Sequence, residues 1–202
     1  MPTGGLAAGD AGVALLALRL WARTGDDIFG HLAEKRLSRA LAQVPRAGTG
    51  LADGTAGVLL VAAEAAATME PRWWRDVARL IATLAAPRDR PGLHDGTAGI
   101  LHVLAALHRR PETPDVTPLI AAHLVHLRTF ARADGGGIVF PAEPGGPARC
   151  DLGFGASGIL TALQAVGMAR DDPDRTGWAE LLPVVLPEPA TPIHRVSATR
   201  PR

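Results

Sequence analysis

The sequence of 202 residues contains one cysteine and no tyrosine, and aromatic residues make up only 4% of it. A single cysteine excludes an internal disulfide framework and is typical of proteins in a reducing compartment. Neither sign of charge dominates, because 21 Lys and Arg residues stand against 20 Asp and Glu residues. The composition therefore gives no reason to expect binding to nucleic acid or to an anionic membrane.

Long hydrophobic runs are also missing. No apolar run reaches the roughly 18 residues that a membrane span needs, and no cationic leader precedes the apolar residues 11–20, as a signal peptide would require. We therefore expect a soluble, cytoplasmic protein. Its 47% of apolar residues are enough for the core of one domain. We expect this domain at residues 1–186, and a disordered, proline-containing tail at residues 187–202.

What the sequence does contain is a repeated glycine-rich motif. Residues 50–57 and 92–99 both read Gly-Leu-x-Asp-Gly-Thr-Ala-Gly, residues 5–12 share the frame, and residues 151–158 form a weaker fourth copy. Each copy precedes about a dozen mainly apolar residues at helical spacing, so each is expected to be a turn that leads into a buried helix. Such self-similarity indicates a repeat architecture, in which one unit cannot bury its apolar face alone.

Buried and amphipathic helices are expected to alternate along the chain. The buried helices are predicted at residues 12–22, 55–68, 97–109 and 156–168, the amphipathic ones at 28–44, 71–86 and 119–131 (with Thr117 as cap), and a short last one at 178–186. A helix that is apolar all round needs cover on every side. An inner ring of buried helices with amphipathic helices outside meets this need, so we predict an all-α fold, an α/α toroid or an arc of one. No alternation of period two predicts a sheet, and only residues 138–140 suit a short extended piece.

The repeated frame Gly-Leu-x-x-Gly-x-Ala-Gly resembles that of the lanthionine synthetase C-like (LanC-like) family. More specifically, it resembles the C-terminal part of the cyclase domain of class III and IV lanthipeptide synthetases, and residues 140–160 are similar to the last repeat of that domain. The resemblance covers roughly residues 4–170. It implies a double ring of helices that closes thioether rings in a precursor peptide, by adding a cysteine thiolate to dehydroalanine or dehydrobutyrine. A complete family domain has more inner helices than the four found here, so a partial ring is expected.

The resemblance also bears on cofactors. Zinc-using members of the family carry Cys and Cys-His immediately before the second glycine of particular motif copies. Those slots here hold Ala7-Ala8, Ala52-Asp53, His94-Asp95 and Gly153-Phe154, and Cys150 lies outside them. Because zinc favours sets of nitrogen and sulfur ligands that one cysteine cannot supply, we expect neither a metal site nor a cofactor, as in the class III branch.

Three polar residues of the second and third copies are the candidates for catalysis. An imidazole titrates where a thiol must lose its proton, so His94 is the candidate base for the thiol and acid for the α-carbon; a hydrogen-bonded loop histidine is the equal alternative. Asp53 and Asp95 share one slot and are expected to be helix N-caps. The alternative is that one of them accepts the cysteine proton or orients a neighbouring group. The remaining histidine pairs are expected to be solvated or satisfied locally: His102 and His108, and His123 and His126.

The motif glycines have two compatible interpretations. Packing is favoured: they let the loop take positive φ and let the inner helices approach closely. The functional interpretation is that the helix N-termini converge on a substrate cavity and present free N–H groups to a thiolate or an enolate. The glycines expected to shape that cavity are Gly54, Gly57, Gly96, Gly99, Gly155 and Gly158.

Three functions remain open from the sequence. The first is a cyclase fragment that acts on a precursor peptide. The second is a catalytically inert peptide-binding or scaffold module that completes a split or partner synthetase. An incomplete arc would leave apolar flanks exposed, which predicts self-association or a partner. The third, an unrelated α/α-toroid enzyme for glycans or terpenes, is disfavoured because the chain has few aromatic residues for a cavity.

Overall fold

The computed structural model describes residues 4–44, 48–134, 137–141 and 146–170. These residues form seven α-helices, a short 3-10 helix and one strand pair. In chain order they are α1 (Asp10–Thr24), α2 (Asp27–Gln43), α3 (Thr55–Thr68), η2 (Pro71–Trp73), α4 (Trp74–Thr83), α5 (Thr97–His108), α6 (Thr117–Arg128), β1 (Arg132–Asp134), β2 (Gly137–Val139) and α7 (Ala156–Arg170).

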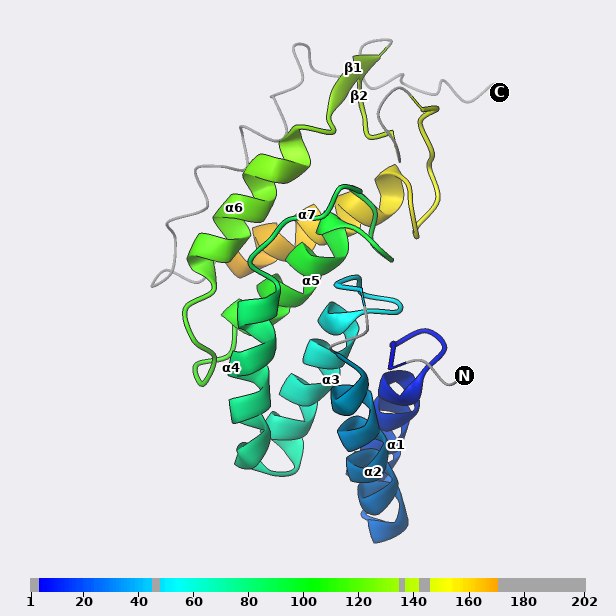
Figure 1. Ribbon diagram of the computed structural model, residues 1–202, viewed down its shortest axis with the longest axis vertical. Helices are drawn as coiled ribbons and strands as arrows, with labels where there is room; N and C mark the ends of the chain where they lie inside the picture. Colours follow the sequence, from blue (N-terminus) through cyan, green and yellow to red (C-terminus); the bar gives the residue numbers. More distant parts are fainter. Residues whose placement is uncertain (1–3, 45–47, 135–136, 142–145, 171–202) are drawn as a thin grey trace, which may run out of the picture.

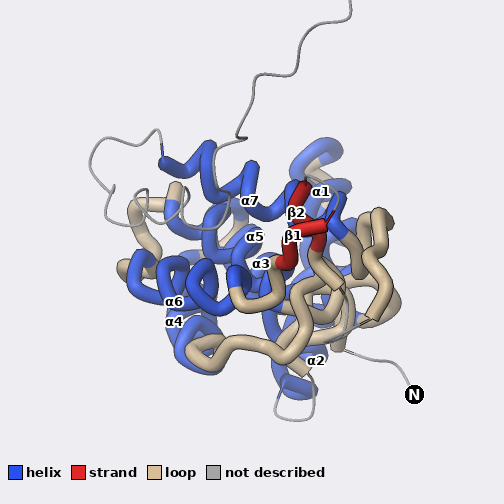
Figure 2. Tube along the Cα trace, turned by 90° about the horizontal axis from the view of Figure 1, so that it is seen from above, coloured by secondary structure: helices blue, strands red, loops and turns tan. Residues whose placement is uncertain are grey.

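The helices form two layers. Helices α1, α3, α5 and α7 pack on one another in chain order and form an arc, while α2, α4 and α6 pack on the outside of α1, α3 and α5. Both views place α4 and α6 on the same side of α3 and α5 (Figure 1, Figure 2). The all-α fold and the alternation of inner and outer helices that the sequence predicts are thus confirmed.

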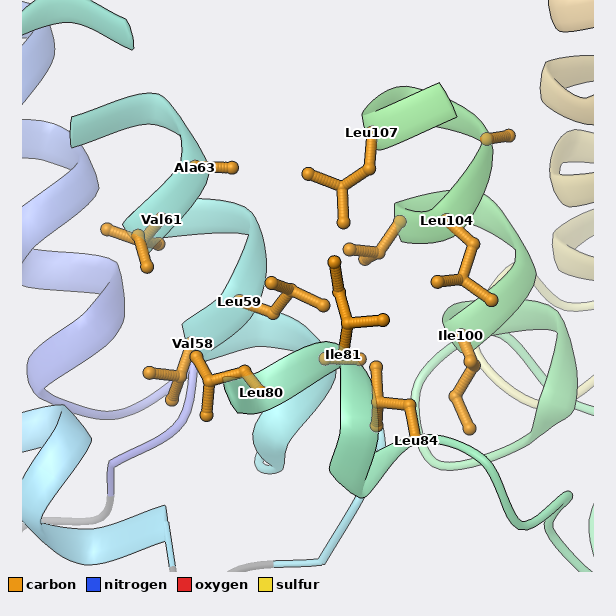
Figure 3. Packing of buried hydrophobic residues seen from close by; sticks show 14 of the residues in the cluster. Val58, Leu59, Val61, Ala63, Leu80, Ile81, Leu84, Ile100, Leu104 and Leu107 are labelled. Carbon is orange, nitrogen blue, oxygen red and sulfur yellow. The ribbon is translucent and has the colours of Figure 1, made fainter. Parts of the chain in front are cut away.

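The core lies between the two layers, as Figure 3 shows for α3, α4 and α5. Helices α3 and α5 are buried on nearly every side, because an inner helix also packs on each of their flanks. Helix α4 buries one stripe and turns its arginines outward. The buried residues of α3, α4 and α5 that Figure 3 labels include Val58, Leu59, Val61, Leu80, Ile81, Leu84, Ile100, Leu104 and Leu107. The one charge of α3, Glu64, binds Arg110 at 2.6 Å.

The ends of three helices can be compared with the caps and boundaries expected from the sequence. The Asp26 carboxylate accepts a hydrogen bond from the Ile28 N–H at 2.9 Å and caps α2. The prediction that Thr117 caps α6 is wrong: Thr117 is the first residue of the helix, and its N–H donates to the Asp115 carboxylate at 2.9 Å. Helix α4 ends at Thr83 and not at residue 86, in keeping with Pro87, which disfavours helical backbone in the residue before it.

A small hairpin is the one element that the sequence prediction missed. Strand β2 pairs antiparallel with β1, and Ala133 lies opposite Ile138. Three-residue strands are too short to show an alternating pattern, so only the apolar strand was expected to be extended. The predicted helix at 178–186, the domain boundary at 186 and the tail at 187–202 fall outside the described residues. No helix within the described ranges is both long enough and apolar enough to cross a membrane.

Candidate functional site

The four motif turns are joined into one ladder by main-chain hydrogen bonds. The third residue of each copy donates to the third residue of the next: Ala7 N–H to Ala52 (2.7 Å), Ala52 N–H to His94 (2.9 Å) and His94 N–H to Gly153 (2.9 Å). Figure 1 shows the loops that lead into α1, α3 and α5 beside one another. Motif copies far apart in sequence therefore form a single surface, with His94 between the second and fourth turns.

The first glycine of a turn is required because the next turn crosses directly over it. A Cβ atom on Gly5 would lie 2.5 Å from the Cα of Asp53, and one on Gly50 would lie 2.7 Å from the Cα of Asp95. The same atom on Gly92 would lie 3.0 Å from the Cα of Phe154. Distances under 3.0 Å essentially do not occur for real Cβ atoms, so any side chain here would push two turns apart.

The six glycines predicted to shape a cavity are packed against main chain. Cβ atoms on Gly54, Gly96 and Gly155 would lie 2.4 to 2.5 Å from backbone atoms of their own loops. Cβ atoms on Gly57, Gly99 and Gly158 would lie 2.0 to 2.2 Å from the leucine carbonyl oxygen of their own turn. They would also lie 2.8 to 3.0 Å from the leucine Cβ of the preceding turn, which is Leu6, Leu51 or Leu93. Each leucine thus rests on a glycine of the following copy, and close packing explains these residues.

The prediction that the motif glycines adopt positive φ is wrong. The N-cap glycines have φ of −139° at Gly9, −124° at Gly54 and −121° at Gly96, which is backbone that other residues also adopt. Among the described residues only Gly25, at the end of α1, has a positive φ, of 69°. The motif requires glycine because there is no room for a side chain, and not because the backbone adopts a conformation that only glycine allows.

The prediction of free N–H groups at the inner helix N-termini is also wrong. Each motif loop curls back, so its own carbonyls accept the amides of the first helical turn. The first amides of α3, α5 and α7 bond in this way: Thr55 to Gly48, Thr97 to Arg90 and Ala156 to Arg149, each at 2.8 Å. These amides are thus already hydrogen-bonded and do not form an open anion site.

Neither candidate aspartate caps a helix. The N-cap residues of α3 and α5 are Gly54 and Gly96, and no side-chain hydrogen bond caps either helix. The half-buried Asp95 carboxylate binds Arg90 at 2.7 Å, while Asp53, one turn away, is exposed. The two aspartates lie on adjacent turns, and each has an atom within 3.4 Å of where a Cβ on Gly50 would be. Adjacent turns therefore bring the aspartates together without giving them the predicted caps.

His94 lies at the joint between the third and fourth turns. Its ring covers Gly153, since a Cβ there would lie 2.7 Å from the His94 Nδ1. The ring also makes a T-shaped contact with the Phe154 ring at a centroid distance of 5.5 Å, and the side chain is half-buried. In the described part of the chain, Arg90 and not His94 holds the Asp95 carboxylate. The imidazole thus keeps partial access to solvent while its loop is fixed by hydrogen bonds on both sides.

Arg149 and Asp151 also belong to this joint, and neither was identified from the sequence as a site residue. The Arg149 guanidinium lies over the Phe154 ring at 5.4 Å, and its Nε donates to the Asp151 carboxylate at 2.7 Å. Asp151 also accepts the Phe154 N–H at 2.7 Å. That hydrogen bond, together with Arg149, holds the pKa of Asp151 below its usual range. Ser157 donates to the Cys150 carbonyl oxygen, and Cys150 itself is exposed.

Of the two alternatives expected for the other histidines, solvated or satisfied locally, solvation is wrong for two of them. His108 and His123 are fully buried. The His123 Nε2–H donates to the Leu84 carbonyl oxygen at 2.8 Å and joins α6 to the end of α4. Burial lowers the pKa of His123 below its ordinary value of 6.5, and burial together with Arg109 lowers that of His102.

We expect His123 to make the fold sensitive to mild acid. Because its pKa is lower in the folded chain, the unfolded chain binds more protons below pH 6.5. The free energy of unfolding should then fall as pH drops below 6.5, by at most about 1.4 kcal/mol per pH unit for this group. A His123→Gln variant can still donate to Leu84 and should show a shallower slope in denaturant titrations between pH 7 and 5. Exposed His31 provides the control, His31→Gln; an unchanged slope for His123→Gln would contradict the prediction.

The described residues do not fit a zinc site. Nowhere in the ranges that the structure describes do three or more His, Cys, Asp or Glu side chains gather as metal ligands would. His94 and Asp95 take the family's ligand slots in the third turn, but Asp95 is bound to Arg90.

An open pocket of ≈ 410 Å³ lies at the other end of the ladder from His94. The first turn and α1 form its walls, among them Gly12, Val13 and Leu16, and Arg36 of α2 lies at its side. Arg36 is held there by the buried Asp10 carboxylate at 2.8 Å. None of the glycines predicted to shape a cavity lines this pocket.

Comparison with known proteins identifies one family whose model matches this chain. The model of the family described as "Lanthionine synthetase C-like protein" matches residues 3–177. Among solved structures, the chain is similar to nisin cyclase, with a TM-score of 0.66 and 16% sequence identity. The similarity covers 89% of this chain and 57% of that chain, so the present chain spans little more than half of its length. At this identity the likeness shows the fold alone. No curated protein matches the sequence significantly.

Proposed function

Because the chain belongs to the lanthionine synthetase C-like family, we propose that it is a cyclase unit of lanthipeptide biosynthesis that acts on a precursor peptide. The family match over most of the chain is the observation that carries this proposal. The fold shared with nisin cyclase supports it. The reaction is the addition of a peptide cysteine thiol to dehydroalanine or dehydrobutyrine, which closes a thioether ring.

His94 is the proposed acid and base. Its imidazole takes the thiol proton, the sulfur forms a bond to the β-carbon, and the π electrons of the double bond move toward the carbonyl as an enolate. The imidazolium then returns the proton to the α-carbon, so no other reactant is consumed. The half-exposed ring, placed on a loop that is bonded to both neighbouring turns, supports this assignment.

The surrounding groups have supporting roles in the proposal. The enolate needs a donor or positive charge nearby, and the first-turn amides are already bonded to their own loops. Arg149 lies over the Phe154 ring, which also contacts the His94 ring, and is the proposed cationic group. Asp95, whose carboxylate binds Arg90, follows His94 in the same turn, and exposed Asp53 lies on the adjacent turn. The unit is proposed to work without zinc.

The test uses a synthetic peptide that contains one dehydroalanine and one cysteine. Cyclisation does not change the mass but protects the thiol from alkylation, so alkylation followed by mass spectrometry reports it. We expect His94→Asn to slow cyclisation by about 10²–10⁴-fold, the usual contribution of a general acid or base. His31→Asn on the outer helix α2 is the matched control and should keep the wild-type rate. A chelator should leave the rate unchanged; a rate that requires zinc would contradict the zinc-free mechanism.

A catalytically inert peptide-binding or scaffold module is the second candidate. One observation favours it: the first-turn amides, which would stabilise an enolate, are occupied by loop carbonyls. The wild-type protein would then bind the peptide, which fluorescence anisotropy would detect, but would not cyclise it faster than the uncatalysed reaction. That result would remove the cyclase proposal and leave the module.

A further inference from the structure

The inner helices bury equivalent positions, except at the ends of the arc. The residues one and four places after the third motif glycine are 0 to 1% exposed in three helices: Val58 and Val61, Ile100 and Val103, Ile159 and Ala162. Their equivalents in α1, Val13 and Leu16, are 40% and 61% exposed. Because α1 is the one described inner helix with no repeat before it, this face is the one that a preceding helix covers.

The opposite face is open at the other end. The residue two places after the third motif glycine is fully buried in the first three inner helices, as Ala14, Leu59 and Leu101, because an inner helix follows each of them. The equivalent residue of α7, Leu160, is 53% exposed. The turn shows the same difference. Leu6, Leu51 and Leu93 rest on glycines of the following copy, whereas Leu152 of the fourth turn is 56% exposed. The arc thus ends in a projecting leucine.

The pocket at α1 matches that leucine. Gly12 in its wall corresponds to Gly57, Gly99 and Gly158, each of which receives a leucine from the preceding turn. The main-chain ladder does not continue in the same way. In the described chain no residue donates to the carbonyl oxygen of Ala7, but the Gly153 N–H, which would be the next donor, already binds Asp151 of its own turn. The match between the two ends therefore rests on the apolar side chains.

We propose that a second copy of this chain docks head to tail on the α1 face. Its Leu152 enters the pocket at Gly12, and its Leu160 packs against Val13 and Leu16, repeating the contact that joins the internal copies. The proposal does not depend on the cyclase activity. Interfaces of this kind either close into a ring or continue as a chain of copies.

Sterics define how this joint differs from the internal ones. Asp151 replaces the first glycine of the fourth turn, and a Cβ at that position in the other turns would lie 2.5 to 3.0 Å from the next turn. The joint must therefore open slightly, which makes the association weaker than an internal contact and reversible. Charge contributes little to the joint, because Arg36 and Arg39 already bind the buried Asp10 carboxylate and Asp151 already binds Arg149.

The experiment measures the mass of the purified chain by sedimentation over a range of concentrations. The wild type should form a dimer or a larger species reversibly. Leu16→Lys and Leu160→Lys change exposed residues at opposite ends, so both should fold, and each should weaken association about tenfold or more because a lysine ammonium would be buried. Val125→Lys is the matched control, because Val125 is equally exposed on the outer helix α6, and it should associate as the wild type does.

Mixing the two variants tests the head-to-tail geometry. An equimolar mixture of Leu16→Lys and Leu160→Lys retains one unaltered joint, between α7 of the first variant and α1 of the second. The mixture should therefore form a heterodimer at concentrations where each variant alone is monomeric. A monomeric wild type, an effect of only one lysine variant, or no recovery on mixing would each overturn the proposal.

Discussion

Gly57→Ala is expected to lower the free energy of unfolding by about 3 kcal/mol, a large effect for the addition of one methyl group. The new Cβ would lie 2.2 Å from the Leu51 carbonyl oxygen and 2.9 Å from the Leu6 Cβ. Both atoms belong to turns held by the hydrogen-bond ladder, so neither can move without breaking a joint. Denaturant unfolding followed by circular dichroism, at one fixed protein concentration, measures the change.

Gly167→Ala is the matched control for Gly57→Ala. Gly167 lies inside α7, and a Cβ there would have no atom within 4 Å. Alanine should therefore stabilise the helix by about 0.5–1 kcal/mol. If Gly57 instead served mainly to shape a substrate cavity, Gly57→Ala would retain wild-type stability and lose only activity. That outcome would refute the packing explanation of the motif.

Leu104→Ala should be about as destabilising, for a different reason. Leu104 is fully buried in α5 and lies in the core shared with α3 and α4 (Figure 3). Truncation removes the transfer free energy of its side chain and leaves a cavity, and such substitutions cost about 3–4 kcal/mol. Thermal and denaturant unfolding of the variant would measure the loss.

The control for Leu104→Ala removes an exposed side chain from the outer layer. Val125 is 53% exposed on α6, so Val125→Ala should stay within about 0.5 kcal/mol of the wild type. Equal losses for the two variants would mean that the core is not where the structure places it. A loss under about 1 kcal/mol for Leu104→Ala would mean that α5 can collapse into the space, contrary to its burial on nearly every side.

Together the two pairs separate two kinds of close packing. The glycines allow main chain to contact main chain between turns, while the leucines fill the space between helices. Only the first kind is repeated with the motif. For this reason the motif is expected to tolerate no larger residue at its first and third glycines wherever a further turn of the same chain adjoins it, and Asp151 stands in the last of the four described turns.

The sequence by itself determined the features that depend on neighbours within a few residues. The 3.6-residue periodicity of apolar residues placed α3 at Thr55–Thr68, with both ends as predicted. The motif repeat gave the number of inner helices and their order. These signals are local: the residues that form a helical turn or a cap lie next to one another in the chain.

Only the tertiary structure decided what the motif residues contact. That His94 covers Gly153 depends on two turns almost sixty residues apart, and that His123 is buried against Leu84 depends on how α6 packs beside α4. The repeated glycines correctly indicated close packing. The path of each loop decided two further points that the sequence could not: the sign of φ at the glycines, and whether the first amides of each helix are hydrogen-bonded. The sequence determined which faces are apolar. The arc of four copies decided which of them are covered, because burial requires a neighbour, and among the described residues the first and last inner helices are each flanked by an inner helix on one side.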